Sequence, residues 1–212
     1  MVSGIPNVYG QDDGVEADAG YRADTDPDTD PEADTFGPAM FRTAMSRFPT
    51  GVTIVTTDDE HGNPSGFTAS SFCSVSTNPP LILVCLATSA NSYPVFARCD
   101  RFAVSILRPQ HTELARRFAS KDTDKFVGTF AHTPGGLTVV DGALAVFECG
   151  VHERHEAGDH VIMIGRVRSV WTRAGDPVVY HDREFGTLAP NRVGDPGAPV
   201  PVGPVGQVRP RA

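Results

Sequence analysis

The stretch Gly66-Phe67-Thr68-Ala69-Ser70-Ser71-Phe72-Cys73-Ser74-Val75 places small hydroxylated residues between apolar ones. A polar turn at residues 58–64 precedes it, so the stretch has the pattern of a strand that leaves a hairpin. Thr68, Ser70 and Ser71 offer three hydroxyl donors, and successive amides in a turn can form an anion-binding concavity. The stretch is a candidate phosphate cradle, although hydroxylated residues after a hairpin are more often solvated turn residues.

Short apolar and β-branched segments on both sides of this stretch predict a chain made mainly of strands. We expect strands at residues 52–57, 68–75, 81–86, 102–107, 144–151 and 161–171, and short helices at 92–98 and 110–118. Pro38 opens a further helix, whose apolar residues Phe41, Ala44, Met45 and Phe48 follow the helical period. The joins between strands are too short for repeated crossover helices, which favours an antiparallel barrel over a parallel sheet.

Charge and composition divide the chain into one domain with two tails. Residues 1–36 hold ten of the 26 acidic residues but only one basic residue, Arg22, so the remainder is close to neutral despite a net charge of −8. We predict a disordered acidic tail over 1–36, a globular domain over 37–189, and a disordered tail rich in Pro and Gly over 190–212. The acidic tail is a solvated extension, or an arm that contacts a partner or shields a basic cleft.

Several classes of protein are not favoured by these patterns. The near-neutral body does not predict a nucleic-acid surface, and no secretory signal or membrane span is visible, so we expect a cytoplasmic protein. Cys73, Cys85, Cys99 and Cys149 form no C-x-x-C pair and lie mostly in apolar strands. They are expected to be buried reduced thiols rather than disulfides or metal ligands.

The order of segments across residues 36–188 resembles the short-chain flavin reductase family, the reductase partners of two-component flavin-dependent monooxygenases. The segments that carry the resemblance are Phe48-Pro49-Thr50-Gly51-Val52, the 66–75 stretch, Asn78-Pro79-Pro80, Asn91-Ser92, Arg116-Arg117-Phe118, Asp124-Lys125-Phe126 and Gly158-Asp159-His160. The resemblance implies a mainly β fold, a split antiparallel Greek-key β-barrel with a few short helices. It also implies a homodimer that binds flavin, FMN or FAD, at its interface.

The resemblance places the flavin phosphate and ribityl chain against the hydroxylated stretch. The cofactor-binding residues that it implies are Thr68, Ser70, Ser71, Asn91, Ser92 and Arg117. The flavin ring needs donors at its polar edge and an apolar slot, for which backbone amides near Gly66, Phe67 and Ala87 are candidates. Phe118 and Phe126 are either walls of this slot or core residues. Pro49 and Thr50 approach the ring or only end the first helix.

Gly158-Asp159-His160 is the second candidate site. The resemblance associates this turn with nicotinamide binding, which makes His160 the candidate catalytic residue and Asp159 the residue that fixes the turn or the histidine tautomer. A rival interpretation groups His152, His155 and His160 as metal ligands. In a continuous strand His152 and His155 point to opposite faces, so we expect no metal site.

These features predict an NAD(P)H-dependent flavin reductase that oxidises NADH or NADPH and supplies reduced flavin to a separate monooxygenase. Two alternatives stay open: a non-catalytic flavin- or haem-binding split barrel, and a single-component enzyme that keeps its flavin and oxidises a small substrate itself. Phe130-Ala131-His132 stands where many members of the family have a tryptophan. The residues do not determine which flavin or which nicotinamide is preferred.

Overall fold

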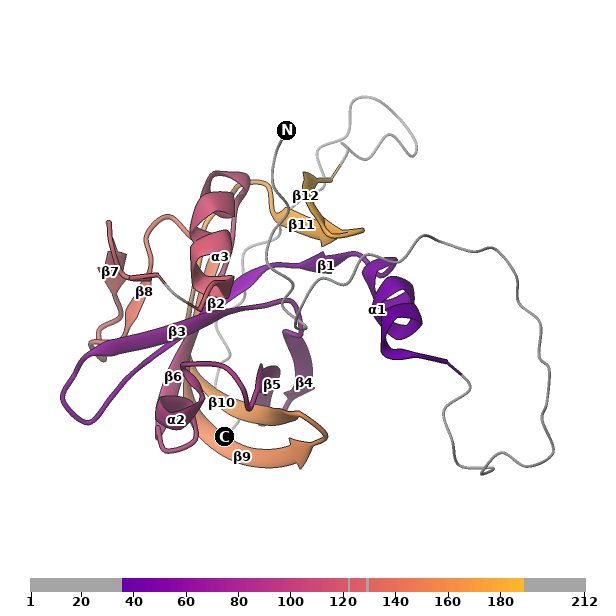
Figure 1. The fold of residues 1–212 in the computed structure, drawn as a ribbon. Helices are drawn as coiled ribbons and strands as arrows, with labels where there is room; N and C mark the ends of the chain where they lie inside the picture. The colour runs from indigo at the N-terminus through magenta and orange to yellow at the C-terminus, as the bar shows by residue number, and fades with distance from the viewer. Residues whose placement is uncertain (1–35, 122, 129, 189–212) are drawn as a thin grey trace.

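A computed structural model of the protein describes residues 36–121, 123–128 and 130–188. Its largest element is a seven-stranded antiparallel sheet, which has the strand order β3-β2-β6-β9-β10-β5-β4 (Figure 1). The strands are β2 (Thr53–Asp58), β3 (Pro64–Ala69), β4 (Cys73–Thr77), β5 (Pro80–Ala87), β6 (Arg101–Ile106), β9 (Ala145–Ala157) and β10 (His160–Thr172). The mainly β antiparallel fold predicted from the sequence is confirmed.

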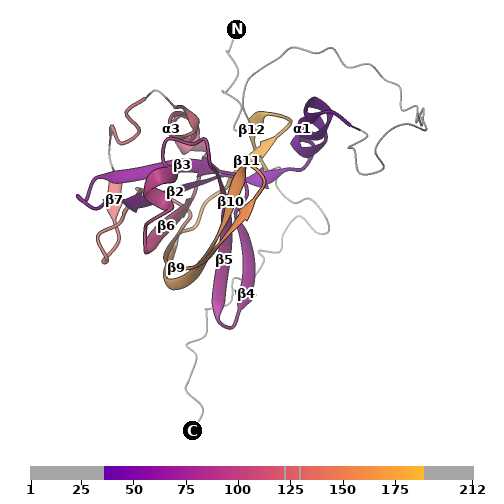
Figure 2. The same ribbon diagram turned by 60° about the horizontal axis from the view of Figure 1, so that its bottom comes forward.

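Two smaller sheets and four helical segments complete the described part of the chain. The smaller sheets are formed by β1 (Thr50–Gly51), β11 (Val178–His181) and β12 (Glu184–Thr187), and by β7 (Phe130–His132) and β8 (Thr138–Val140). The helices are α1 (Pro38–Ser46), α2 (Tyr93–Phe96) and α3 (Thr112–Ala119), with the 3₁₀ turn η1 (Pro109–His111) before α3. Figure 2 shows α3 and α1 on opposite sides of the β11–β12 hairpin.

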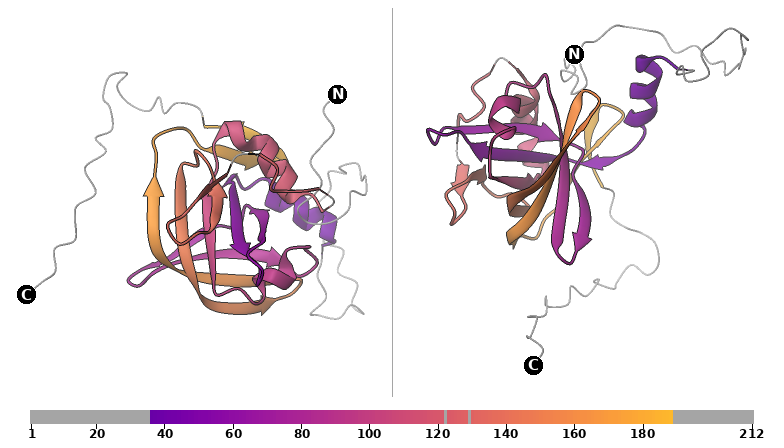
Figure 3. Two further views of the ribbon diagram at one scale, coloured as in Figure 1. Left: turned by 90° about the vertical axis from the view of Figure 1, so that its left-hand side faces the viewer. Right: turned by 90° about the horizontal axis from the view of Figure 1, so that it is seen from below.

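The two edge strands of the large sheet follow each other directly in the sequence. β3 ends at Ala69 and β4 begins at Cys73, so only Ser70, Ser71 and Phe72 connect opposite edges of a seven-stranded sheet. A link this short requires the sheet to curl until its edges meet, since an extended residue spans at most about 3.5 Å. Figure 3 shows the curled sheet wrapped around its interior. The hydroxylated stretch therefore bridges the split in the barrel.

The interior of the barrel is filled by one face of each strand. On β5, Ile82, Val84 and Leu86 are buried, whereas the residues between them are half-buried on the outer face. They pack with buried side chains from the other strands, including Phe67, Phe102, Val104 and Met163. β2 and β6 are buried on both faces, which explains why short apolar and β-branched runs in the sequence located these strands.

A second apolar cluster lies on the other side of β2 and β6, beneath α3. Ala115 and Phe118 of α3 pack there against Ile54 and Leu107. The Thr68 hydroxyl on β3 donates to the carbonyl of Ala115 at 2.7 Å, which fixes α3 to the open edge of β3. This packing sets the position of β3 just before the three-residue link.

The structure corrects three expectations from the sequence. The strand expected over 68–75 is interrupted, because residues 70–72 leave one edge of the sheet before β4 begins the other. Cys73 is exposed rather than buried, although all four cysteines are free. The expected helix at 92–98 is shorter, only Tyr93–Phe96. Both tails, 1–36 almost entirely and 190–212, lie outside the described residues.

The helix opened by Pro38 forms as predicted, but none of its residues is buried. Met40, Phe41 and Met45 are about half or more exposed, with 67%, 52% and 48% of their surface accessible. The apolar face read from the sequence therefore has no cover within the described chain. Across the described residues, no helix combines the length and apolar character needed to cross a bilayer.

Candidate functional site

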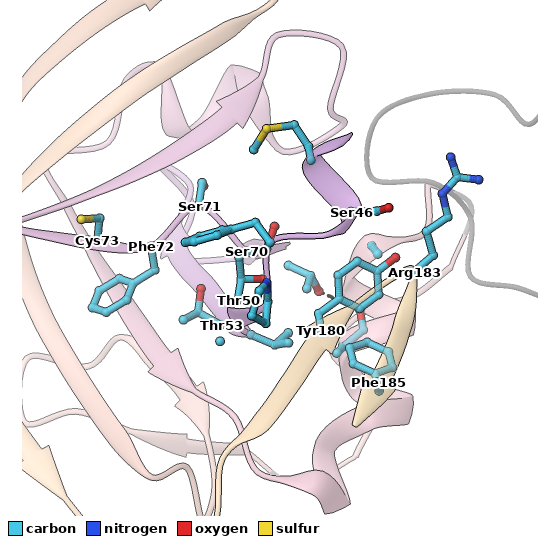
Figure 4. Close-up of a pocket in the computed structure, with 18 of the residues that line it drawn as sticks. Ser46, Thr50, Thr53, Ser70, Ser71, Phe72, Cys73, Tyr180, Arg183 and Phe185 are labelled. Atoms are coloured by element: carbon cyan, nitrogen blue, oxygen red, sulfur yellow. Dashed lines mark hydrogen bonds between the residues drawn. The ribbon is translucent and has the colours of Figure 1, made fainter. Parts of the chain in front are cut away.

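A cavity of about 560 Å³ opens where the split of the barrel faces α1 and the β11–β12 hairpin. Its barrel wall is formed by the residues that link β3 to β4, together with Thr50–Thr53 and Ile106. Figure 4 shows Thr50, Thr53 and Ser70 on the barrel side of the cavity, facing Tyr180 and Phe185 of the hairpin. A volume of this size falls within the range of small-molecule and cofactor sites, roughly 300–1,000 Å³.

Only some of the hydroxyl groups that line the cavity are available to a ligand as donors. The Thr53 hydroxyl donates to Ala69 O at 2.9 Å, and the Thr68 hydroxyl is already committed to α3. Ser71 Oγ accepts from the Cys85 amide at 2.9 Å. In contrast, Thr50 Oγ1 is buried without a partner among the described residues. Buried hydroxyls normally have partners, so this orphaned group fits a ligand that binds there.

The backbone of the link offers donors of its own. Within the described residues, Ser70, Ser71 and Phe72 form no backbone–backbone hydrogen bond, because they lie between two strands that pair with different neighbours. Ser70 and Phe72 also line the cavity (Figure 4). These three residues are half-buried, and successive turn amides without a partner can form a polar edge for a ligand.

The wall opposite the barrel comes from α1 and the β11–β12 hairpin. Arg42, Met45 and Ser46 of α1 contribute one side of it. Tyr180, Arg183 and Phe185 of the hairpin contribute the other, and the rings of Tyr180 and Phe185 lie 5.3 Å apart between centroids. This wall supplies apolar surface and two guanidinium groups.

Most of the other expected cofactor-binding residues lie outside this lining. Phe67 belongs to the barrel interior, where its ring meets Phe96 edge-on at 5.0 Å. Phe118 of α3 and Phe126 also meet edge-on, with their ring centroids 5.0 Å apart. Of the implied set, the cavity brings together Thr68, Ser70 and Ser71; the residues Gly66, Phe67, Ala87, Asn91, Ser92, Arg117 and Phe118 are not part of its lining.

Three of the residues outside the cavity hold the segment between α3 and β7 in place. Arg117 donates to the carbonyl of Val127, and Asn91 Nδ2 donates to Lys121 O at 2.7 Å. Gly66 O accepts from Lys125 Nζ at 3.1 Å. Burial lowers the pKa of the Lys125 amine from its ordinary value. These groups are used within the protein, which the sequence could not reveal because their partners belong to another segment.

The Gly158-Asp159-His160 turn connects β9 to β10, as predicted. Gly158 adopts a left-handed φ of 60°, which glycine accepts without strain. His160 Nδ1 lies 2.7 Å from Asp159 Oδ1, and because a carboxylate can only accept, Nδ1 carries a proton. This hydrogen bond, together with the charge of the His160 ring, lowers the pKa of the Asp159 carboxyl below its ordinary value of 3.8.

The register of β5 relates His160 to the cavity. Ser71, at the rim of the cavity, is hydrogen-bonded to Cys85, and His160 is the cross-strand partner of Ala87, two residues further along β5. Two residues of a strand span about 7 Å. His160 is not part of the cavity lining, but it lies beside the Ser71 end of the cavity on the outer face of the sheet.

The histidines near the turn are not gathered into one group. His152 falls at a β-bulge, because Val151 and Glu153 pair with successive residues of β10. His155 Nε2 is paired with Glu153 Oε2 at 2.8 Å. Among the described residues, no three His, Cys, Asp or Glu side chains are placed to hold a metal ion.

Sequence reasoning missed the wall formed by the β11–β12 hairpin. The segment Val178-Val179-Tyr180-His181-Asp182-Arg183-Glu184-Phe185 alternates apolar and polar residues around an Asp-Arg turn, which is a weak hairpin signal. Asp182 and Arg183 have φ values of 50° and 64°. Two-residue hairpin turns need such values, but Asp-Arg lacks the glycine that usually marks them.

Residues 45–189 match the family model described as flavin reductase like domain. The protein named actinorhodin polyketide dimerase of Streptomyces coelicolor is 59% identical over 151 residues, which cover 70% of this chain and 85% of that protein. The FMN reductase (NADH) SmoA of Agrobacterium fabrum is 38% identical over 149 residues, which cover 70% of this chain and 85% of that protein.

A solved structure of another protein has a similar fold. The Streptomyces globisporus NADH:FAD oxidoreductase SgcE6, in complex with NAD and FAD fragments, superposes with a TM-score of 0.70. Its sequence is 33% identical, and the match covers 76% of this chain and 99% of that chain.

Proposed function

The chain belongs to the flavin reductase-like family, and we propose that it reduces FMN or FAD with NADH or NADPH at the cavity beside the barrel split. The observation that carries this assignment is the combination of an apolar cavity with unpaired donors on its barrel wall, at Thr50 and at the 70–72 link. Relatives named as an FMN reductase and an NADH:FAD oxidoreductase support the same two cofactor classes.

The residues of the cavity fit a flavin in both polarity and shape. Phe72, Tyr180 and Phe185 provide apolar and aromatic surface for a planar ring. Thr50 Oγ1 and the amides of the 70–72 link, which have no partner among the described residues, would donate hydrogen bonds to its polar edge, where negative charge develops on reduction. When bound, a flavin supplies a ring that accepts a hydride from the reduced nicotinamide.

His160 is proposed to position the nicotinamide. Asp159 holds its Nδ1 at 2.7 Å, and Thr88 N in turn donates to the Asp159 carbonyl at 2.9 Å, which fixes the turn against the end of β5. A ring held in this way beside the cavity orients the co-substrate without taking part in acid–base chemistry. Correct orientation of two reactants can supply a large part of the rate enhancement.

The reduced flavin is proposed to leave this protein and serve a separate monooxygenase. The Streptomyces coelicolor relative is named for polyketide dimerisation, so we propose that the enzyme served by this chain acts on a polyketide. The same name favours a second candidate, in which this chain itself couples two polyketide molecules, with O₂ accepting the two electrons of the coupling and the two of NADH and leaving as water. The two differ in whether NADH oxidation requires the polyketide.

We also propose a homodimer, formed through the outer face of β5 and β10. Leu81, Leu83 and Cys85 of β5 lie beside Ile162 and Ile164 of β10 on that face, all half-buried and with no further layer of the described chain over them. Cys73, which pairs with Leu83, also lines the cavity, so this face continues into the site. The uncovered apolar residues of α1 give a second surface for the same partner.

A change of association state tests the homodimer. Leu83→Lys is expected to convert a dimer to a monomer in light scattering, because a charge on the buried face of an interface is costly. Val127→Lys is the matched control, since Val127 is 57% exposed on another surface. Loss of the dimer in both variants, or in neither, would contradict the proposed face.

The reaction is tested by following the absorbance of the reduced nicotinamide. We expect purified protein to consume NADH or NADPH only when FMN or FAD is added, and without any polyketide. Consumption that requires a polyketide would favour the second candidate, and no turnover with any combination would refute both.

The cytoplasm is the proposed location. Reduced nicotinamides are cytoplasmic co-substrates, and the four free cysteines fit a compartment in which thiols stay reduced.

A further inference from the structure

We propose that Arg42 and Arg183 bind the phosphate group of the flavin at the mouth of the cavity, an inference that rests on the proposed flavin reductase function. Both residues line the cavity, and no Asp or Glu lines it among the described residues. The mouth therefore carries two positive charges that no carboxylate of the lining neutralises. A flavin nucleotide differs from riboflavin in the anionic phosphate that such a pair would bind.

Neither guanidinium is used elsewhere in the described chain. Among the described residues, Arg42 and Arg183 form no ion pair or side-chain hydrogen bond, whereas Arg47 pairs with Asp182 at 3.3 Å and Arg116 pairs with Glu113 at 3.4 Å. Arg117, the arginine implied by the family resemblance, donates to Val127 O and lies outside the cavity. An arginine can offer a phosphate two parallel hydrogen bonds, which makes an uncommitted one at a cavity mouth a strong candidate.

The two faces of α1 explain why Arg42 is part of the cavity lining. Arg42, Met45 and Ser46 are three or four residues apart and line the cavity together, whereas Met40 and Phe41 lie on the exposed face. Arg42 is half-buried on a helix whose other residues are mostly exposed. The helix thus places Arg42 and Met45 on the side of the cavity, and Met40 and Phe41 on its exposed side. Arg42 also precedes residues 45–189, the part of the chain that the family model matches.

Asp182 ties the segment that carries Arg183 to the helix that carries Arg42. Its amide donates to Ser46 O at 2.8 Å, and its carboxylate pairs with Arg47. The next residue, Arg183, has a left-handed φ of 64°, a conformation that costs a non-glycine residue free energy. The turn is held in this conformation, with Arg183 at the rim of the cavity (Figure 4). Asp182 therefore joins the two segments that carry Arg42 and Arg183.

The test compares the binding of riboflavin, FMN and FAD by flavin fluorescence titration of the full chain. Each of Arg42→Gln and Arg183→Gln is expected to weaken FMN and FAD about tenfold, the loss typical of one charge-assisted hydrogen bond. Riboflavin affinity should stay within about twofold, since it has no phosphate. Arg98→Gln, which removes an exposed charge elsewhere, should change none of the three.

Four other outcomes would contradict either the phosphate site or the proposed function. If FMN affinity is unchanged in both variants but falls in Arg117→Gln, the phosphate is bound by Arg117 and the proposal is wrong. If the variants raise KM for NADH and leave FMN affinity unchanged, the two arginines serve the dinucleotide instead, which also overturns it. Failure of the unaltered protein to bind any of the three flavins would refute the proposed function itself. Equal affinity for riboflavin and FMN in the unaltered protein would refute only the phosphate site.

Discussion

The two walls of the cavity are built in opposite ways. The barrel wall continues from β3, where Phe67 and Ala69 are 6% and 3% exposed, so its link residues are fixed by the core behind them. The wall of α1 and the β11–β12 hairpin has no buried helical residue, and Asp182 joins its two parts through Ser46 and Arg47. A site with one rigid and one lightly held wall can place the flavin ring precisely while adapting the outer wall to a ligand or partner.

The largest effect is expected from a change in the rigid wall. A Cβ on Gly66 would lie 2.8 Å from both Val55 O and a ring atom of Phe118. Gly66→Ala should therefore push β3 away from β2 and lower the free energy of unfolding by about 2 kcal/mol or more. Gly51→Ala is the control, because a Cβ there has no neighbour within 4 Å. Denaturant titration of both variants measures the difference; equal stability would show that β3 is not rigidly held.

Two threonines of the barrel wall allow a structural hydroxyl, that of Thr53, to be compared with a proposed ligand-binding hydroxyl, that of Thr50. Thr53→Val removes the hydrogen bond to Ala69 O and should cost about 1 kcal/mol of stability. Thr50→Val removes a buried hydroxyl that has no partner, so stability should be maintained while FMN affinity falls about fivefold to tenfold. Thermal unfolding and FMN titration on both variants test this contrast. The assignment of Thr50 fails if its removal destabilises the protein without changing flavin affinity.

A substitution in the wall formed by α1 and the β11–β12 hairpin should change the dynamics of that wall more than the stability of the protein. Asp182→Asn keeps a residue type that tolerates a left-handed φ but weakens the pairing with Arg47. Because surface ion pairs contribute little, the free energy of unfolding should change by less than about 1 kcal/mol. Amide hydrogen exchange in α1 should nevertheless become faster. Asp176→Asn serves as the control, and unchanged exchange in α1 would show that Asp182 is not its anchor.

The smallest effect concerns the His160 turn. The pKa of Asp159 is lowered by His160, so this hydrogen bond is fully present above the ordinary carboxyl value of 3.8 and is lost as pH falls through the folded value. In an NMR titration, His160→Ala should return the Asp159 pKa toward 3.8. Asp59, whose pKa is lowered by Asn63, should keep its low value in the same variant. If the Asp159 pKa is the same in His160→Ala as in the unaltered protein, the hydrogen bond to His160 is not the cause of its lowering.

The sequence predicted the strands and turns that are encoded by local residue patterns. Short apolar and β-branched runs gave the positions of β5, β6 and β10, and Gly158 marked the turn before His160, since both features are encoded within a few residues. It placed a strand across residues 68–75, because it could not show that Ser70 joins opposite edges of a curled sheet. The partners of Arg117 and Asn91 are likewise backbone atoms of another segment, which no local pattern reveals.

The outer wall was the least accessible to prediction. The period of α1 was read correctly, but helical periodicity indicates an apolar face and not what covers it. Arg183 belongs to a turn whose Asp-Arg sequence is unusual for its conformation. Arg42 and Arg183 can be recognised as part of one cavity only in the structure, where Asp182 joins the end of α1 to the hairpin.

Amide hydrogen exchange of the full chain, with and without FMN, tests the central claim most directly. If the flavin binds between the barrel split and α1, FMN should protect the amides of Ser70, Ser71 and Phe72 and those of residues 50–53. Protection confined to Asn91, Ser92 and the segment after α3, or no protection at all, would contradict this location.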